Sequence, residues 1–425
     1  MKNILFAIGL FLLTACQTKQ AEPFDAGQSL QYCTSQVNRA LSELQDKDGQ
    51  YDFTMEPRNI LEGENSWNCR KASAEEWCSG FWPGVLWMTY ANEALRMKKE
   101  ESAAALPLDS LRTIAEGYTD ALSFLASQPV FDHDLGFLVI NSFLKGYEAM
   151  GNDSGATRSK REYYKQIALA AADTLATLYN NKVGTILSWP RHVKDYGGHN
   201  TIMDNMINLE LLFWASRNGG DKRLADMAVK HAETTMNNHF REDGSCYHVA
   251  VYDTLDGHFV KGVTHQGYAD SSMWSRGQSW AIYGYTMVYR FTHDQRFLVH
   301  AQKVADIYLK RLRETSDDWV PLWDMDDPRG LKAPKDASAA CVVASALLEL
   351  QQYTDKEKAS GYMQAAENML RDLSSDRYQS RDKNVAFLLH STGHHPAGSE
   401  IDASIIYADY YYIEALTRYL NLKKA

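Results

Sequence analysis

Hydrophobic residues recur along most of the chain three or four positions apart, which is the spacing of one face of an α-helix. Together with residues that favour helix starts and stops, this pattern predicts about twelve segments of ordinary helix length. No long linker divides the segments into two domains. The predicted segments are residues 28–45, 82–98, 109–127, 135–149, 160–180, 203–217, 221–238, 274–291, 296–314, 337–353, 356–374 and 402–420.

Alternate segments differ in how much of their surface is apolar. The segments at 160–180 and 356–374 carry one apolar stripe, which predicts an outer layer. The other kind is small or apolar on most faces, which predicts an inner layer. About six outer and about six inner helices in alternation predict an all-α fold, an (α/α)6 barrel of alternating inner and outer helices. The predicted inner helices begin near Trp82, Leu135, Met203, Trp274, Ala337 and Ser404.

Two short strands are predicted among the helices, at about residues 245–253 and 259–263. Asp256 and Gly257, between them, favour a tight turn, so the two strands are expected to form a β-hairpin. This hairpin would carry His248 toward the loop that precedes Trp274.

The chain is organised around residues 262–285, where a polar loop becomes an almost wholly apolar helix. Ser271 and Ser272 are candidate N-cap residues, and the helix is predicted to begin at about Trp274. Its first two turns should therefore present side chains to the end of the barrel at which the inner helices begin.

Those two turns carry Trp274, Arg276 and Trp280. Indole rings offer a stacking surface for a sugar, and a guanidinium offers a forked partner for a carboxylate, so we predict a site for an anionic ring. The alternative is a core tryptophan pair with one solvated arginine. The whole chain has 44 Lys and Arg against 54 Asp and Glu, a net charge of −10, which argues against nucleic acid as a partner.

The N-terminus has the features of a secretion signal. A charged start is followed by an apolar run from Ile4 to Leu13, too short to span a bilayer as a folded helix. The sequence from Leu13 to Cys16 resembles a bacterial lipobox, whose cysteine becomes lipidated; simple secretion is the alternative. We therefore predict a signal peptide at 1–16, a tether at 17–25, a single catalytic barrel at 26–425, and a lipid anchor in the bacterial cell envelope, periplasmic or facing outward on the outer membrane.

Five cysteines follow Cys16, and none forms a C-x-x-C pair. Cys69 and Cys78 could bridge in an oxidising compartment, whereas most of the others are expected to be small buried hydrophobes. Histidine and aspartate residues that could hold a metal are too far apart in sequence to form a recognised motif, so no metal and no cofactor are predicted. The potential ligands are His133, Asp134, His265, Asp270, His394 and His395.

Asp204 and Asp134 are the candidate catalytic acids. Asp204 lies in an apolar segment, where burial would raise its pKa and make it a proton donor near neutral pH. Each aspartate has an alternative role as the N-cap of its own helix, and His133 could be a hydrogen-bonded wall residue. Two carboxyl groups at one pocket are the minimal requirement for glycoside chemistry, but their spacing does not assign acid and base.

Several blocks of sequence resemble glycoside hydrolase family 88, the unsaturated glucuronyl hydrolases. The resemblance extends over essentially the whole mature chain, and the block from Trp274 to Gly284 is the most specific part. The family fold is an (α/α)6 barrel, which agrees with the helix pattern. The matching blocks are residues 77–87, 133–137, 203–209, 245–248, 264–270, 274–284 and 409–416.

The resemblance implies an enzyme that releases a 4,5-unsaturated uronic acid from the non-reducing end of oligosaccharides left by polysaccharide lyases. It implies hydration of the C4=C5 enol ether, with Asp204 as general acid and base and Asp134 in contact with ring hydroxyls. Substrate-lining positions implied by the resemblance are Trp77, His133, Trp189, His248, Gln266, Trp274, Arg276, Trp280 and His394.

The stretch after Ser391 departs from the family members that accept sulfated disaccharides. Those members place further serines and a lysine there, whereas this chain continues with residues 392–396, Thr-Gly-His-His-Pro. Sulfate preference is therefore open. One alternative enzyme is the related unsaturated rhamnogalacturonyl hydrolase class, which acts on pectin fragments. A non-catalytic glycan-binding lipoprotein is the alternative of a different class, and the presence of both aspartates argues against it.

Overall fold

The structure, a computed structural model, describes residues 24–100, 107–151 and 155–423. The predicted signal peptide, Cys16 and most of the predicted tether lie outside these ranges. In the described part of the chain, no helix is long and apolar enough to cross a membrane.

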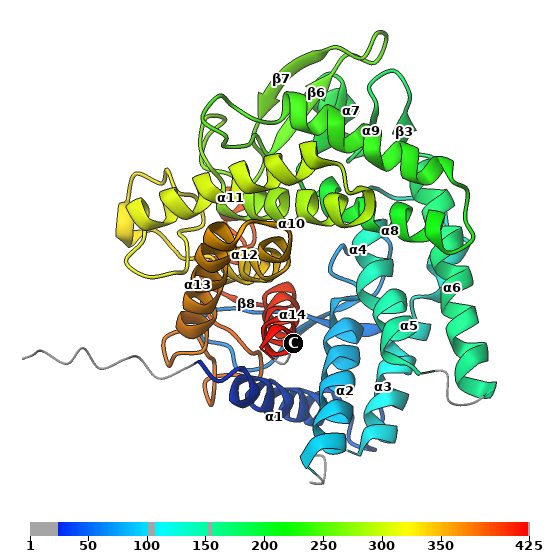
Figure 1. Cartoon of the computed structure of the whole chain (residues 1–425). Helices are drawn as coiled ribbons and strands as arrows, with labels where there is room; N and C mark the ends of the chain where they lie inside the picture. Colours follow the sequence, from blue (N-terminus) through cyan, green and yellow to red (C-terminus); the bar gives the residue numbers. More distant parts are fainter. Residues whose placement is uncertain (1–23, 101–106, 152–154, 424–425) are drawn as a thin grey trace, which may run out of the picture.

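An inner ring of helices surrounds the centre of the molecule (Figure 1). Each inner helix contacts the next in chain order, and the last one contacts the first, so the ring is closed. One member of the ring is interrupted by a π-helical turn at Ile140–Leu144. The inner ring consists of α2 (Phe81–Glu100), α4 and α5 (Leu135–Val139 and Lys145–Ala149), α8 (Asn205–Arg217), α10 (Ser275–Thr292), α12 (Ala337–Leu350) and α14 (Ile406–Leu422).

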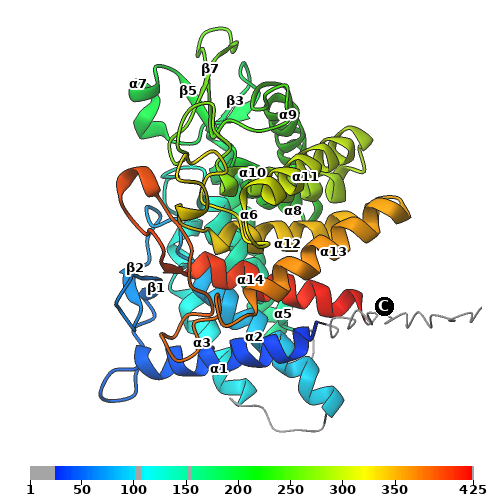
Figure 2. The same ribbon diagram turned by 90° about the vertical axis from the view of Figure 1, so that its left-hand side faces the viewer.

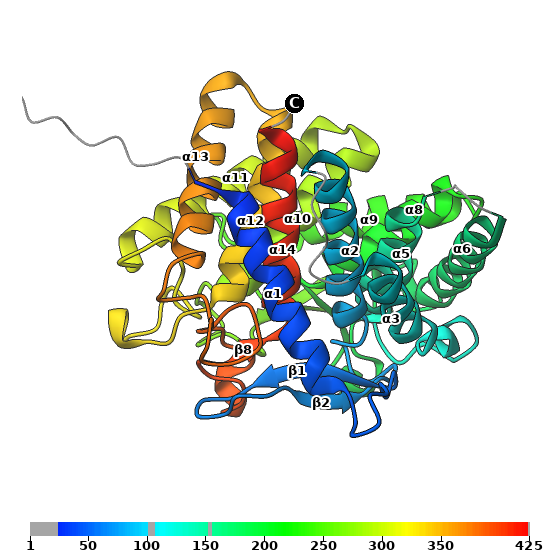
Figure 3. The same cartoon turned by 90° about the horizontal axis from the view of Figure 1, so that it is seen from below.

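A second layer of amphipathic helices packs around this ring. Each outer helix buries its apolar stripe against inner helices, and Figure 3 shows α1 running along α14. All the predicted helical segments are present, with ends shifted by a few residues, so the predicted (α/α)6 barrel is confirmed. The outer helices are α1 (Ala26–Leu44), α3 (Leu108–Asp120), α6 (Gly155–Ala176), α9 (Arg223–Asn238), α11 (Gln295–Thr315) and α13 (Lys356–Leu373).

The predicted hairpin is confirmed and is part of a larger sheet. Strands β6 (Val249–Tyr252) and β7 (Phe259–Val263) pair antiparallel, and β5 (His199–Ile202) pairs with the other edge of β6. A second sheet has the order β2 (Asn68–Lys71), β1 (Met55–Ile60), β8 (Ser404–Ile405). Figure 2 shows both sheets at the same end of the barrel, the end at which the inner helices begin.

Smaller elements complete the description. Strands β3 (Tyr179–Asn180) and β4 (Thr185–Ile186) form a two-stranded ladder before the short helix α7 (Val193–Tyr196). Single turns of 3-10 helix occur at Ser123–Ala126, Pro190–His192, Gly330–Lys332, Gln351–Tyr353 and His395–Ala397.

A partly buried network of ion pairs joins the inner helices at the opposite end of the barrel. The Arg418 guanidinium lies 2.9 Å from Glu349, and Arg290 lies 2.7 Å from Glu210. Glu414 accepts hydrogen bonds from the hydroxyls of Tyr283 and Ser345. Every charge has an opposite partner here, so the network joins helices α8, α10, α12 and α14 without leaving an unpaired buried charge.

Inner helices approach one another closely where one of them carries glycine. A Cβ atom at Gly284 of α10 would overlap the backbone and Cβ of Met206 on α8, and neither can move without shifting a buried helix. Gly361, on the outer helix α13, has no atom within 4 Å of the same position. The two glycines are therefore a matched pair for testing the inner packing.

We expect Gly284→Ala to destabilise the protein by about 1–3 kcal/mol, because an added methyl group overpacks the α8 to α10 contact. Gly361→Ala should instead be stabilising by about 0.5–1 kcal/mol, because alanine favours the helix and meets open space. Urea unfolding followed by circular dichroism measures both changes. Equal effects of the two substitutions would contradict the close inner packing.

Candidate active site

A pocket of about 180 Å³ opens at the end of the barrel where the inner helices begin. Seven of the residues predicted from sequence line it, although long stretches of chain separate them. The predicted residues that line the pocket are Trp77, Asp134, Trp189, Asp204, Gln266, Arg276 and His394. The remaining four predicted residues, His133, His248, Trp274 and Trp280, are buried.

Asp204 directly precedes α8 and points into the pocket. Its side chain makes no capping hydrogen bond to α8, so the alternative that it is merely the N-cap of its helix is wrong. Its Oδ2 atom is buried and has no hydrogen-bond partner among the described residues. Burial raises the pKa of Asp204 to about 7, against the opposing positive charge of Arg276. Asp204 can therefore hold or release a proton near neutral pH.

Asp134 directly precedes α4 and also makes no capping hydrogen bond. Burial raises its pKa well above the usual value, and the neighbouring charges of Asp132 and Asp204 act in the same direction. The Arg191 guanidinium opposes this shift, and it lies 2.9 Å from Asp132. The two catalytic candidates thus share one pocket and interact electrostatically.

A histidine lies beside each aspartate. The Nε2 atom of His133 is 3.2 Å from Asp134 Oδ1, and Nε2 of His248 is 3.6 Å from Asp204 Oδ2. Both imidazole rings are almost completely buried. The structure therefore places His133 and His248 behind the aspartates, as supports of the pocket wall.

Arg276 differs from the expectation of an exposed guanidinium at the start of its helix. It is 1% exposed, and its Nη1 atom donates to Asp336 Oδ2 at 2.7 Å. The guanidinium also donates to the backbone carbonyls of Thr392 and Gly393. The alternative of a solvated arginine is therefore wrong, because the guanidinium is buried and holds Asp336 and the loop that carries His394. A contact of Arg276 with the substrate stays a prediction, since the residue also lines the pocket.

The start of α10 also differs from expectation. The helix begins at Ser275, and the residue before it, Trp274, makes no side-chain cap. The predicted cap Ser272 instead donates its hydroxyl to Asp324 Oδ2 at 2.7 Å. A short bridge between Trp274 and Asp324 holds this loop in place of a serine cap.

The aromatic lining comes from loops and differs from the predicted tryptophan pair. Trp189 packs against His265 with ring centroids 5.0 Å apart, and His265 packs against His394 at 4.9 Å. Trp274 lies behind this wall, with its ring 4.4 Å from that of His248. Trp280 is fully buried and its indole N–H acts to lower the pKa of Asp204.

Some lining residues were not in the predicted set. His265 occurs in a block that matches the family, and Arg191 follows the predicted Trp189 closely, but their side-chain directions could not be read from spacing. Asp336 was missed, although an acid directly before the almost wholly apolar helix α12 is a usable signal. The lining residues outside the predicted set are Glu75, Asp132, Arg191, His192, Ile202 and His265.

Asp132, His133 and Asp134 bring potential metal-binding atoms within 4.8 Å of one another. Protein groups already occupy several of these atoms: Nδ1 of His133 contacts the carbonyl of Ser188, and Asp132 Oδ2 pairs with Arg191. A guanidinium beside the cluster disfavours a cation. The expectation that the enzyme needs no metal stays a prediction.

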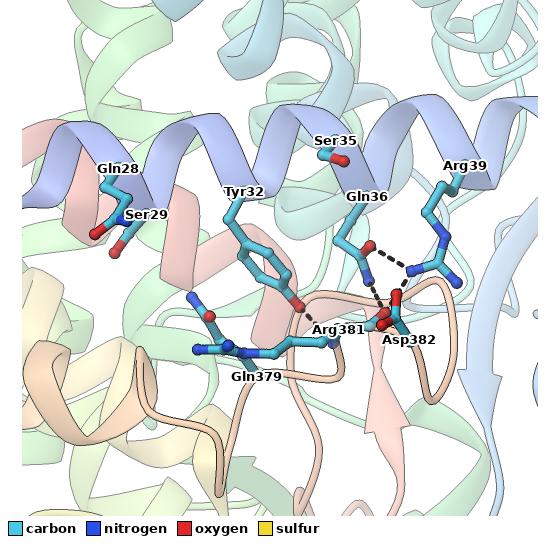
Figure 4. Close-up of a pocket in the computed structure, with 9 residues that line it drawn as sticks. All are labelled: Gln28, Ser29, Tyr32, Ser35, Gln36, Arg39, Gln379, Arg381 and Asp382. Carbon is cyan, nitrogen blue, oxygen red and sulfur yellow. Dashed lines mark hydrogen bonds between the residues drawn. The ribbon is translucent and has the colours of Figure 1, made fainter.

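Other cavities flank the barrel. A groove of about 1,020 Å³ shares the lining residues Glu75 and Trp77 with the catalytic pocket, so the two are adjacent. A third cavity lies between α1 and the loop at 379–382 (Figure 4). There Gln36 donates to Ser380 and to backbone carbonyls, so its amide ties α1 to that loop.

The five described cysteines are free thiols, so Cys69 and Cys78 do not form the disulfide that an oxidising compartment would allow. The Cys78 thiol contacts the guanidinium of Arg58 instead.

A closed double ring of helices with two buried carboxyl groups in an aromatic pocket is an arrangement suited to a glycoside hydrolase. The profile of Glycosyl Hydrolase Family 88 matches residues 156–421. An unsaturated glucuronyl hydrolase of Formosa agariphila is 39% identical over 83% of this chain and 82% of its own length. An unsaturated chondroitin disaccharide hydrolase of Streptococcus pyogenes is 34% identical over 81% of each chain.

Solved structures agree. The crystal structure of an unsaturated glucuronyl hydrolase specific for heparin superposes with a TM-score of 0.80 at 36% identity, covering 94% of this chain and 98% of that one. The enzyme from Bacillus sp. GL1 superposes with a TM-score of 0.78 at 28% identity, covering 93% and 96%. The chain therefore belongs to glycoside hydrolase family 88 and is a glycosidase, which rules out the non-catalytic alternative.

We expect Arg276→Ala to destabilise the fold by about 3–5 kcal/mol, because it leaves the Asp336 carboxylate buried without its partner. Lys358→Ala, which removes the more exposed pair with Asp306, should change stability by less than about 1 kcal/mol. Chemical unfolding of both variants measures the difference. A small effect of Arg276→Ala would show that the guanidinium does not hold the barrel mouth together.

Proposed function

We propose that this enzyme releases a 4,5-unsaturated uronic acid from the non-reducing end of oligosaccharides produced by polysaccharide lyases, by adding water across the C4=C5 enol ether. The observation that carries the proposal is the buried Asp204 carboxyl, which has a pKa of about 7 and belongs to a residue that lines an aromatic pocket. A proton donor of this kind suits an enol ether, which needs a proton at C4 and water at C5.

One carboxyl group is enough for both steps. Protonated Asp204 gives its proton to C4, and the ring oxygen stabilises the cation that develops at C5. The resulting carboxylate then takes a proton from the water that attacks C5, which restores the starting state. The hemiketal product rearranges and expels the rest of the saccharide, so no enzyme nucleophile attacks the anomeric carbon.

Asp134 supports the same substrate ring. Its carboxyl group faces the pocket beside Asp204, where it can accept or donate a hydrogen bond to ring hydroxyls. The indole of Trp189 and the imidazoles of His265 and His394 offer flat surfaces for the sugar.

The rest of the saccharide is proposed to extend into the adjoining groove. The pocket has room for little more than one sugar ring, whereas the groove that shares Trp77 with it is several times larger. Arg70 and Lys71 line that groove and favour acidic sugars, although glutamates line it as well. Relatives named for glucuronyl and chondroitin substrates favour glycosaminoglycan-like fragments over pectin fragments.

The function is tested by loss of the ultraviolet absorbance of the unsaturated uronide on lyase-derived disaccharides. A saturated glucuronide with the same linkage is the matched control, since it has no double bond to protonate. We expect turnover of the unsaturated substrate and no detectable cleavage of the saturated one. Efficient cleavage of both would indicate ordinary glycoside hydrolysis and refute the hydration proposal.

Asp204→Asn keeps the shape of the side chain but cannot shuttle a proton, so turnover should fall by about 10²–10⁴-fold. In the native enzyme, kcat/KM should be highest below pH of about 7 and should fall as the pH rises through the pKa of Asp204, because the acid must start protonated. Asp226→Asn, on the exposed face of α9, is the control and should retain full activity. Near-normal turnover by folded Asp204→Asn would remove this residue from the mechanism.

We also propose that Cys16 is lipidated and holds the enzyme on the bacterial cell envelope, on the support of the lipobox-like sequence from Leu13 to Cys16. A labelled fatty acid should be incorporated into the native chain expressed in a bacterium and not into Cys16→Ser. Equal labelling of the two chains would contradict the anchor.

A further inference from the structure

The histidine beside Asp134 has its tautomer fixed by the backbone. Nδ1 of His133 lies 3.1 Å from the carbonyl oxygen of Ser188. A carbonyl oxygen only accepts hydrogen bonds, so Nδ1 must carry the proton. Burial lowers the pKa of His133, so the ring is neutral and Nε2 is left with a lone pair. Nε2 lies 3.2 Å from Asp134 Oδ1 and accepts no hydrogen bond from the described residues, so its lone pair is free for a proton on that carboxyl group.

The histidine beside Asp204 has the opposite tautomer. Nδ1 of His248 lies 3.2 Å from the backbone N of His265 and 3.1 Å from that of Gln266. Both of these groups donate, so Nδ1 must be an unprotonated acceptor, and the neutral ring carries its proton on Nε2. If Nδ1 were protonated as well, its N–H would point at the two backbone N–H groups, and no acceptor would be present among the three. The ring is therefore held in its neutral form. Its Nε2–H is 3.6 Å from Asp204 Oδ2.

The two carboxyl groups therefore meet opposite partners. A lone pair beside Asp134 repels a carboxylate and accepts a hydrogen bond from a carboxylic acid. An N–H beside Asp204 favours the carboxylate. A pair of neighbouring carboxyl groups with different partners should lose their protons at different pH values, rather than as two equivalent acids.

We propose that His133 and His248 are positioning residues that hold the two aspartates in different protonation states, with Asp134 a neutral acid that donates to His133 and Asp204 the group that gains and loses the proton. The catalytic purpose of this assignment rests on the proposed hydration chemistry. The protonation states themselves do not depend on it. The fixed tautomers mean that the pair Asp134 and Asp204 carries one negative charge, and not two, during a catalytic cycle.

The other charged groups around the pair are consistent with this division. Asp134 also faces the carboxylates of Asp132 and Asp204, which favour its neutral form, and Arg191, which opposes it. Asp204 faces Arg276, whose charge favours the carboxylate. Burial is the largest influence on both groups and favours the acid form of each, so the difference between them comes from their neighbours. The histidine tautomers act in the same direction as the charges.

The division has a chemical purpose. Asp204 gives its proton to C4 and regains one from the water that adds to C5, so the proton of Asp134 is never consumed. A neutral Asp134 can donate to His133 while its carbonyl oxygen accepts from a ring hydroxyl. A second carboxylate at this place would hold the Asp204 proton too tightly for transfer to carbon.

Nuclear magnetic resonance of the ¹⁵N-histidine-labelled enzyme tests the tautomers without any substrate. We expect a neutral ring protonated on Nδ1 for His133 and on Nε2 for His248, with signals assigned from His133→Gln and His248→Gln.

Infrared difference spectra test the protonation state of Asp134. They should show a protonated carboxyl band that persists about one pH unit above the pH at which Asp204 loses its proton. This band should be absent from Asp134→Asn. The proposal would be overturned by an imidazolium at His133 or by either ring in the opposite tautomer. It would also be overturned if the carboxyl band disappeared together with the Asp204 transition.

Paired substitutions separate positioning from simple packing. The amide of His248→Gln can accept from the two backbone N–H groups and donate to Asp204, whereas His248→Leu can do neither. The alkaline limb of kcat/KM should move up by about one pH unit in His248→Leu and stay close to the native position in His248→Gln. Identical profiles in both variants would overturn the role of His248. If no unsaturated substrate is turned over, the proposed function fails, and the spectra still decide the protonation states.

Discussion

The mouth of the barrel depends on the buried ion pair between Arg276 and Asp336. Arg276 lies in the first turn of α10, Asp336 directly precedes α12, and the same guanidinium holds the carbonyls of Thr392 and Gly393 in the loop before α14. Gln266 donates to the Gly393 carbonyl as well. Three segments that are distant in sequence are thereby fixed around one cation. A buried pair of this kind holds a geometry, because breaking it leaves a charge in an apolar place.

The same cation influences the chemistry next to it. Burial favours the protonated form of Asp204, and the positive charge of Arg276 favours the carboxylate. The two effects oppose each other, and the pKa of Asp204 settles at about 7. A carboxyl group with this pKa can act as an acid in one step and as a base in the next. The scaffold that positions the pocket therefore also adjusts its proton donor.

The helices and the hairpin were predictable from sequence because each follows from local periodicity or turn chemistry. Asp204 was predictable as well, since a carboxylate in an apolar run needs an explanation. Strand β5 was missed because His199–Ile202 shows no alternation and is buried throughout. The partner of Arg276 was missed for a different reason: Asp336 lies 60 residues further along the chain, and only the closed ring brings α10 and α12 side by side. Contacts of that range are set by the fold and leave no periodic trace in the sequence.

The central claim is that the enzyme protonates C4 of an unsaturated uronide through Asp204. Turnover in heavy water, followed by nuclear magnetic resonance of the released uronic acid, tests that step directly. Hydration adds a solvent-derived hydrogen to C4, so the account predicts one deuterium at C4, placed on a single face because one fixed carboxyl group delivers it. A product without deuterium at C4 would contradict the account.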